Sequence, residues 1–378
     1  MQYGGGVPEP HEGAPDVGAR THADELDAHL AGLPTGIVQD TRMPPGTAGT
    51  VSQPSAPATE HCPPVPTVPA VPAAPAAQAA QAEPAGLRPR GEPAHVGGRP
   101  PSYPPHPLRC PSVRDGDHFA ALTPAVLLDG AQVGRLTVRA ASIRGDSHNW
   151  EGSCRQDSMT VTRVGPPEAE LLLLAVADGV GSAARSHEGS YHVTHRAALH
   201  LDREAENIHA ALTARDEGEL RAIANKAIAG AVSDLRIGQE HATTLHVLLV
   251  PVDAAVRGRV LFSVGDGGLF VLREGQWQET GPVDEGSLLD TRTEALPHAY
   301  RSVKARLLYG DPGQVLLLGT DGITNPLTQK DPAFARHLAR AWGGPAVPSL
   351  SDFLWQAQTR IKSYDDDRTV ICLWEGTE

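Results

Sequence analysis

The sequence is poor in cysteine, in long apolar runs and in positive charge. Its four cysteines are scattered over 378 residues without a CxxC pair, which argues against a disulfide framework and a zinc knuckle. The longest apolar run, Leu171–Ala177, is far shorter than the ~20 residues of a membrane-spanning helix. Because the formal net charge is −13, a basic face for nucleic acid is not expected either.

These absences set expectations for the location and partners of the protein. No basic segment followed by an apolar one opens the chain, so we expect no export. Together with the cysteine pattern, this indicates a soluble, cytoplasmic protein with reduced thiols. We expect neither a membrane nor a nucleic acid among its partners, and the sequence indicates no oligomeric state.

Proline is concentrated near the N-terminus. Residues 1–110 contain 22 of the 34 prolines and are also rich in Ala, Gly and Gln. Such a composition cannot bury enough apolar area to offset the entropy of ordering the chain, so we expect residues 1–110 to be a disordered tail or linker. Leu26, Leu30 and Leu33 share one helical face, which allows a docking helix, although a transient helix is the simpler interpretation.

The remaining chain predicts alternating groups of strands and helices. Strands are predicted at 136–140, after Asp157, and at 171–177, 245–249, 260–264, 303–307, 315–318 and 369–374. A 3.6-residue period predicts a helix over 220–235. Residues 331–332 (Asp-Pro) begin another, and Ser349 with Asp352 resembles the capping box of a helix that reaches Ile361. This grouping, without a βαβ repeat, predicts an α+β domain with mainly antiparallel sheets.

Aspartates stand at the ends of several predicted strands. Asp178, Asp266 and Asp321 each follow an apolar run and precede glycine, and residues 365–367 are three aspartates before the last strand. A single Asp-Gly pair is ordinarily a turn. The strand ends of a sandwich can converge, however, and clustered carboxylates repel one another unless a cation neutralises them. A cluster of oxygen ligands suits Mg²⁺ or Mn²⁺.

Seven short motifs follow one another in a specific order within residues 133–375. They are Arg144-Gly145 with His148, Gln156-Asp157, Ala177-Asp178-Gly179-Val180-Gly181, Thr243-Thr244, Val264-Gly265-Asp266-Gly267, Gly319-Thr320-Asp321-Gly322 and Asp366-Asp367-Arg368-Thr369. The ordered set resembles the metal-dependent protein phosphatases, the type 2C protein serine/threonine phosphatases, in a bacterial form. The resemblance implies a catalytic domain over residues 111–378. Its fold would be a sandwich of two mainly antiparallel sheets, flanked by helices on both faces, with a metal site between the sheets.

The resemblance also implies a set of metal ligands. Asp178 would bridge two ions, Mn²⁺ or Mg²⁺, and the carbonyl of Gly179 would bind one of them. Asp321 and Asp366 would be the remaining carboxylate ligands. Asp266 would lie where some members of the family add a third ion.

Catalysis by such a site needs no nucleophilic side chain. Two cations lower the pKa of a bridging water, so that a hydroxide between the ions attacks the phosphate. They also neutralise the charge that develops in the transition state. Asp178, which bridges the ions, and Asp157, which would hydrogen-bond metal-bound water, are therefore the candidate catalytic residues.

Phosphate binding departs from the family pattern. The position where an arginine usually binds the substrate phosphate holds Gly152. Arg144, His148 and Arg155 are the candidates that could supply the positive charge instead. His148 could equally be a structural histidine.

Two further positions differ from the family pattern. Gln156 replaces an acidic residue, and Val180 replaces a histidine that can act as general acid in many eukaryotic members.

One group of histidines suggests a different site. His187, His192 and His195 have a spacing that suits a metal, but we expect them on a helix without a carboxylate partner. They are interpreted as a solvated helical face.

We therefore expect a metal-dependent phosphoprotein phosphatase that acts on phosphoserine and phosphothreonine and reverses a bacterial serine/threonine kinase. Gly152 and Gln156 motivate an alternative, a catalytically weak or inactive regulatory module that binds phosphoproteins. A third reading, a phosphatase for a sigma-factor regulator, is weakened because the tail does not resemble a folded sensor. Turnover distinguishes the first reading from the second.

Overall fold

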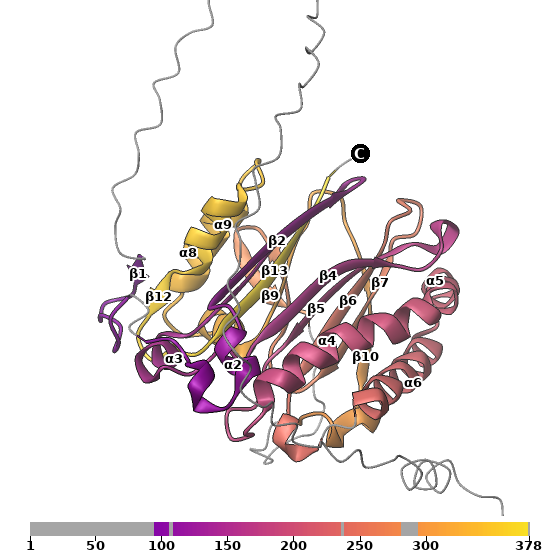
Figure 1. Ribbon diagram of the computed structural model, residues 1–378. Coiled ribbons are helices and arrows are strands. Elements are labelled where there is room, and N and C mark those ends of the chain that lie inside the picture. The colour runs from indigo at the N-terminus through magenta and orange to yellow at the C-terminus, as the bar shows by residue number, and fades with distance from the viewer. Residues whose placement is uncertain (1–93, 106–108, 236–237, 281–293, 377–378) are drawn as a thin grey trace, which may run out of the picture. The chain divides into compact units, whose positions relative to one another are not determined.

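The computed structural model describes residues 94–105, 109–235, 238–280 and 294–376. All of these lie in the second of the two units into which the chain divides, residues 81–378. Within them, two antiparallel sheets pack face to face, and helices cover both outer faces (Figure 1). The predicted α+β sandwich is confirmed, whereas the leucine-bearing helix expected in the tail lies outside the described residues.

The first sheet has five strands in the spatial order β10, β7, β6, β5, β4, and every neighbouring pair is antiparallel. The strands are β4 Ser158–Val164, β5 Leu171–Ala177, β6 Leu245–Pro251, β7 Gly258–Val264 and β10 Lys304–Tyr309. The helices on its outer face are α4 Ser186–Arg203, α5 Ala205–Ala214 and α6 Glu217–Leu235.

The second sheet has six strands in the order β2, β3, β13, β11, β8, β9, again antiparallel throughout. The strands are β2 Val126–Val133, β3 Leu136–Ile143, β8 Gly268–Arg273, β9 Gln276–Glu279, β11 Val315–Gly319 and β13 Arg368–Glu375. The helices on its outer side are α7 Asp321–Leu327, α8 Ala333–Trp342 and α9 Leu350–Ala357.

The position of strand β5 between two layers explains why its sequence is continuously apolar. Its alternate side chains contact two different layers, and all of them are buried. Leu171, Leu173 and Ala175 join the core formed with the helices α4 to α6. Leu172, Leu174 and Val176 join the core between the two sheets. A strand covered on both faces has no polar face, so the alternation typical of half-exposed strands is absent.

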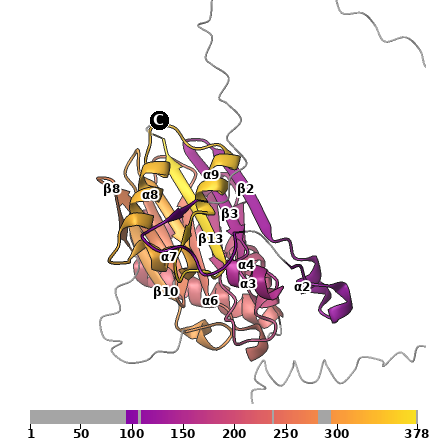
Figure 2. The ribbon, with the colours of Figure 1, turned by 90° about the vertical axis from the view of Figure 1, so that its left-hand side faces the viewer.

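Short elements connect the layers. They are the 3₁₀ helices η1 Val113–Asp115, η2 Pro167–Ala169, η3 Gln239–His241 and η4 His298–Arg301, and the helices α2 His118–Leu122 and α3 Asp146–Glu151. Helix α2 precedes β2 and projects from the edge of the sandwich (Figure 2). Helix α3 follows β3.

Every predicted strand is present, and the helix over 220–235 is confirmed as α6. The N-cap is also confirmed, because the side chain of Ser349 accepts the backbone N–H of Asp352 at 3.1 Å. The capping box is incomplete among the described residues, since the Asp352 carboxylate accepts the hydroxyl of Ser349 at 2.8 Å and not its backbone N–H. The extension of this helix to Ile361 was wrong, since α9 ends at Ala357. Ile361 instead belongs to a two-residue strand, β12 Arg360–Ile361, which pairs in parallel with β1 His95–Val96.

Residues 94–105 contact the sandwich. The backbone N–H of Arg360 donates to the carbonyl of Ala94 at 2.8 Å. The Tyr103 ring lies 6.3 Å from that of Trp150, centroid to centroid. The division of the chain at residue 110 remains a prediction. In the described part of the chain, no helix is long and apolar enough to cross a membrane.

The two-sided burial of β5 predicts a large cost for truncating one of its leucines. Leu174 is fully buried between the sheets, so Leu174→Ala should lower the free energy of unfolding by about 2–5 kcal/mol. Leu199 on α4 is 53% exposed, and Leu199→Ala should change it by less than about 0.5 kcal/mol. Urea denaturation of the two variants measures the difference. Equal effects would contradict the assignment of the core.

Candidate active site

The ends of four strands bring the predicted aspartates together. Asp157 precedes β4 and Asp178 follows β5, and these ends are adjacent because the two strands are antiparallel. Asp321 follows β11 and Asp366 precedes β13, which are adjacent for the same reason. The two sheets thus each contribute a pair of carboxylates to one end of the sandwich.

Two threonines fix the backbone at Asp178. The hydroxyl of Thr244 accepts the N–H of Asp178 at 2.9 Å, and the hydroxyl of Thr243 donates to its carbonyl at 2.8 Å. The next residue, Gly179, lies against the start of α4, where an added Cβ would stand 2.8 Å from backbone atoms of Ser186. The Thr-Thr motif at the start of β6 is therefore hydrogen-bonded to the Asp-Gly motif at the end of β5.

The carboxylates repel one another. Burial, followed by the charges of Asp157, Asp321 and Asp366, raises the pKa of Asp178 to about 11. Burial and the charge of Asp366 raise the pKa of Asp321. Partial burial, with the charge of Asp367, raises the pKa of Asp366. Without a cation, the simultaneous ionisation of these carboxyl groups is therefore unfavourable.

Asp157 is the most enclosed member of this group. It is 3% exposed, and the hydroxyl of Thr320 donates to its Oδ2 at 2.7 Å. Its other oxygen, Oδ1, has no hydrogen-bond partner among the described residues. Burial and the charge of Asp367 raise the pKa of Asp157 to about 8. A buried carboxylate oxygen without a donor is costly unless a water or cation meets it.

Asp266 faces the same region from the turn between β7 and β8. Its charge contributes to the raised pKa of Asp321. The ring of buried His246 contacts the carbonyl of Asp266 through Nε2 at 2.7 Å and so holds the turn. A cavity of about 280 Å³ adjoins Asp266 and is lined also by Thr324 and Asn325 of α7.

Asp367 organises the site, although the sequence analysis gave it no role. Its Oδ1 accepts the backbone N–H of Gly145 at 2.6 Å, and its Oδ2 accepts that of Gln156 at 2.5 Å. His148 Nδ1 lies 2.9 Å from Oδ1. One buried carboxylate thus joins the loop after β3, helix α3 and the start of β4. The run of three aspartates was the signal, but it does not say which one points inward.

The Asp367–His148 contact changes the pKa of both groups. Burial would raise the pKa of Asp367, but the hydrogen bond and charge of His148, with backbone N–H bonds, lower it. Burial would lower the pKa of His148, but the bond to Asp367 and the surrounding aspartate charges raise it to about 9. The imidazolium form is therefore favoured at neutral pH.

The two candidate arginines are buried and bonded to the protein. Arg144 is 5% exposed, and its guanidinium donates to Asn149 Oδ1 at 2.6 Å and to two backbone carbonyls at 3.2 Å. Arg155 is 3% exposed and donates to Ser142 Oγ at 2.7 Å and to the carbonyl of Pro124 at 3.2 Å. Both guanidinium groups hold the surrounding loops.

The backbone conformation at residue 152 favours glycine. It ends α3 with φ of 87°, in the left-handed region that disfavours a side chain. A Cβ there would lie 3.1 Å from Cβ and 3.4 Å from Cδ of Arg109. The side chain of Arg109, a residue outside the predicted site, covers this position.

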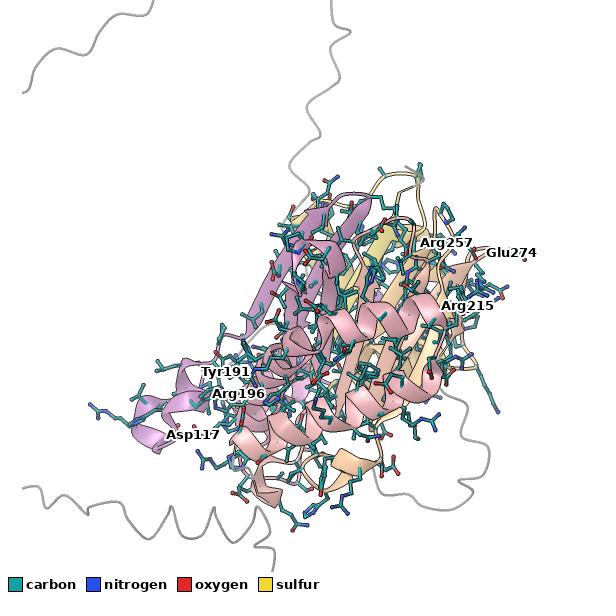
Figure 3. The ribbon with its side chains drawn as sticks, turned by 90° about the vertical axis from the view of Figure 1, so that its right-hand side faces the viewer. Asp117, Tyr191, Arg196, Arg215, Arg257 and Glu274 are labelled. Carbon is teal, nitrogen blue, oxygen red and sulfur yellow. The ribbon has the colours of Figure 1, made fainter. Side chains whose placement is uncertain are left out.

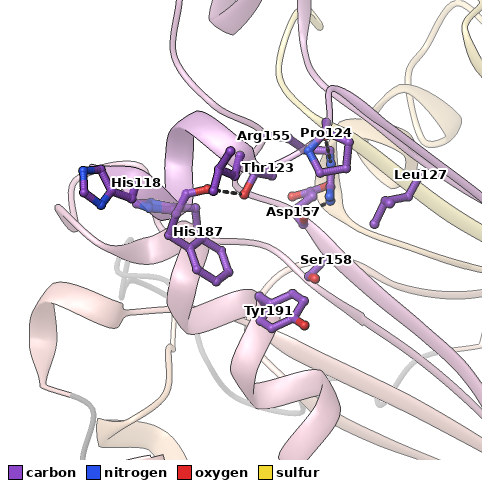
Figure 4. A pocket seen from close by; sticks show the side chains of 11 residues that line it. His118, Thr123, Pro124, Leu127, Arg155, Asp157, Ser158, His187 and Tyr191 are labelled. Carbon is purple, nitrogen blue, oxygen red and sulfur yellow. Dashed lines mark hydrogen bonds between the residues drawn. The ribbon is translucent and has the colours of Figure 1, made fainter. Parts of the chain in front are cut away.

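A cavity of about 460 Å³ lies beside Asp157 (Figure 4). Its walls come from α2, β2, β4 and α4, and most of its lining is apolar. The lining residues include Phe119, Leu127, His187 and Tyr191.

One expectation about histidines is wrong. His187 is not part of a solvated face, because it is 5% exposed and its Nε2 lies 3.1 Å from Oδ2 of Asp117. The carboxylate that seemed to be missing comes from the segment before α2. His192 and His195 lie on the same helix, and His195 Nδ1 contacts the carbonyl of Tyr191 at 2.6 Å.

A comparison with models of known protein families identifies the family of this chain. A family model described as protein phosphatase 2C matches residues 144–355, more than half of the chain. The chain therefore belongs to the protein phosphatase 2C family. No curated protein matches it significantly.

Several solved structures resemble it in fold at low sequence identity. RsbX in complex with magnesium is 17% identical, with a TM-score of 0.41 over 66% of this chain and 100% of that one. The Mycobacterium tuberculosis serine/threonine phosphatase PstP/Ppp is 20% identical, with a TM-score of 0.42 over 66% and 100%. The catalytic domain of PstP with two manganese ions is 19% identical, with a TM-score of 0.41 over 64% and 98%.

The bonds of Asp367 predict a stability effect larger than that of its neighbours. Asp367→Ala should lower the free energy of unfolding by about 2–4 kcal/mol, because buried N–H groups lose their acceptor. Asp365→Ala removes a carboxylate that makes no hydrogen bond with any described residue through its side chain, and it should cost less than about 0.5 kcal/mol. Urea denaturation measures both free energies of unfolding. It is done in excess Mn²⁺, so that a change in the repulsion between carboxylates contributes little to the difference. A small effect for Asp367→Ala would exclude its organising role.

Proposed function

We propose that this protein is a metal-dependent phosphatase that hydrolyses phosphoserine and phosphothreonine in proteins. Its substrates would be targets of a bacterial serine/threonine kinase. One observation carries the proposal: carboxylates from both sheets converge at one end of the sandwich, where burial and mutual repulsion raise the pKa of Asp178. Membership of the protein phosphatase 2C family supports it.

The residues at this end fit two divalent cations. Asp178, Asp321 and Asp366 would hold Mn²⁺ or Mg²⁺, together with the carbonyl of Gly179. All of these donors are oxygen atoms, which Mg²⁺ and Mn²⁺ prefer, whereas zinc sites usually include nitrogen or sulfur. When bound, two such ions would supply a water-derived nucleophile near neutral pH and neutralise charge on the phosphate.

Asp157 would position water beside the ions. Its unpartnered Oδ1 can accept a hydrogen bond, while Thr320 holds Oδ2 and Asp367 accepts the N–H of Asp157 at 3.3 Å. Both contacts keep the carboxylate in one orientation. Asp266, at the edge of the 280 Å³ cavity, would serve a third ion shared with Asp321.

To bind substrate phosphate, the site needs a positively charged side chain whose N–H groups are not already bonded to the protein. Of the three candidates from the sequence, Arg144 and Arg155 donate to protein acceptors. His148 remains, with its Nε2 3.8 Å from Oδ1 of Asp366. We add Arg109, which is exposed, covers Gly152 and makes no side-chain hydrogen bond or ion pair among the described residues.

Both buried arginines, Arg144 and Arg155, donate their hydrogen bonds within the protein, and this also favours a second candidate function. A member of the family that binds substrate phosphate weakly could act as a regulatory module that recognises phosphoproteins. Saturable binding of a phosphothreonine peptide without release of phosphate would support this alternative.

Removing a proposed metal ligand should abolish activity. Asp321→Asn keeps the size of the side chain and removes one carboxylate charge, so turnover should fall by about 10³-fold or more. Asp311→Asn, an exposed change in an ion pair with Arg257, should leave it unchanged. Phosphate release from a phosphothreonine peptide measures both, after chelation and re-addition of Mn²⁺. Turnover by the chelated protein, or by Asp321→Asn at the normal rate, would contradict the metal-dependent reaction.

Arg109 should matter for substrate binding. Loss of a charge-assisted hydrogen bond to phosphate costs about 1.5–3 kcal/mol, so Arg109→Ala should lower kcat/KM by about 10–100-fold, mostly through KM. Arg114→Ala removes another exposed arginine and should have no effect. Steady-state kinetics with the same peptide compares them. Equal kinetics for the two variants would leave His148 as the candidate.

A further inference from the structure

Three potential metal ligands meet at the start of α4, on two separate segments. His187 and Glu188 lie in the first turn of α4, and Asp117 is the N-cap of α2, 70 positions earlier in the sequence. One ligand atom from each residue lies within 4.8 Å of the others. In Figure 3, Asp117 and Tyr191 of α4 are both labelled at the lower left of the domain.

The imidazole of His187 is the unusual member of this group. It is 5% exposed, and its Nε2 makes no hydrogen bond to any described residue, although Oδ2 of Asp117 lies only 3.1 Å away. A buried ring nitrogen that makes no hydrogen bond is unfavourable, even with a carboxylate nearby. A cation between Nε2 and the two carboxylates would satisfy it.

Both carboxylates are oriented but retain free lone pairs. Asp117 uses Oδ1 to cap α2, accepting the N–H of Ala120 at 2.8 Å, which leaves Oδ2 facing His187. Glu188 is 13% exposed, and Arg185 donates to its two oxygens at 2.9 and 2.6 Å. Hydrogen bonds of this kind from outside a metal site orient its ligands.

We propose that Asp117, His187 and Glu188 form a cation site distinct from the carboxylates at the strand ends. One imidazole and two carboxylates are the ligand set of a borderline transition metal such as Zn²⁺, with a fourth position open to water. The nitrogen ligand separates it chemically from the oxygen-only cluster proposed for Mn²⁺ or Mg²⁺.

The site would fasten α2 to α4. Phe119 of α2 already packs on the rings of His187 and Tyr191, with centroids 5.7 and 5.2 Å apart. These three residues line the cavity of about 460 Å³ that also contains Asp157 (Figure 4). A metal at this position would therefore fix one wall of the cavity beside the proposed active site.

The test measures metal binding rather than activity. In the full-length chain with Asp178→Asn and Asp321→Asn, which remove two of the proposed strand-end ligands, Co²⁺ serves as a spectroscopic probe for Zn²⁺. We expect one Co²⁺ per chain with the visible absorption of a four-coordinate site, displaced by Zn²⁺. Because binding is followed in a chain without phosphatase activity, failure of the proposed function would not affect this result.

Three variants in this background identify the ligands. His187→Gln and Asp117→Asn should each weaken Co²⁺ binding at least tenfold, and Asp117→Asn retains an oxygen that can cap α2. His195→Gln, on the same helix, should bind normally and so controls for the loss of a histidine from α4 as such. Circular dichroism checks folding. Absence of stoichiometric binding in the parent, or unchanged binding in folded Asp117→Asn, would reduce the contact to an Asp117–His187 pair and overturn the proposal.

Discussion

Repulsion between carboxylates is the constraint on which this molecule depends. Two antiparallel sheets place strand ends from both layers at one end of the sandwich, and several of these ends hold an aspartate. Folding must enclose these charges because the strands beside them, above all β5, are the core of the domain. The burial of Asp367 is offset because its carboxylate accepts backbone N–H groups and pairs with His148. The proposed cations would relieve the remaining repulsion between the carboxylates at the strand ends.

The two candidate metal sites differ in how the fold builds them. The strand-end cluster follows from sheet topology, because antiparallel pairing alone brings Asp157 beside Asp178 and Asp321 beside Asp366. The Asp117, His187 and Glu188 group depends on α2, a short helix at the edge of the sandwich that packs through Phe119. A cation at the first site would support chemistry, and one at the second would hold a wall of the neighbouring cavity.

Local patterns predicted the core well and the surroundings of the site poorly. Strand β5 was predicted with its correct bounds because Glu170 and Asp178 enclose a continuous apolar run. Strand β2 was missed because its central Asp-Gly pair is typical of a turn, although β2 pairs with β3 along its whole length. The burial of His187 could not be predicted, since Asp117 reaches it only through the tertiary fold.

A crystal structure of the protein soaked in Mn²⁺, with anomalous data collected at the manganese edge, would test directly whether the strand-end carboxylates bind metal. We expect two peaks at the strand ends, both in contact with Asp178, and with Asp321 and Asp366 as further ligands. The absence of manganese there, with the aspartates hydrogen-bonded to one another or to water, would contradict this expectation.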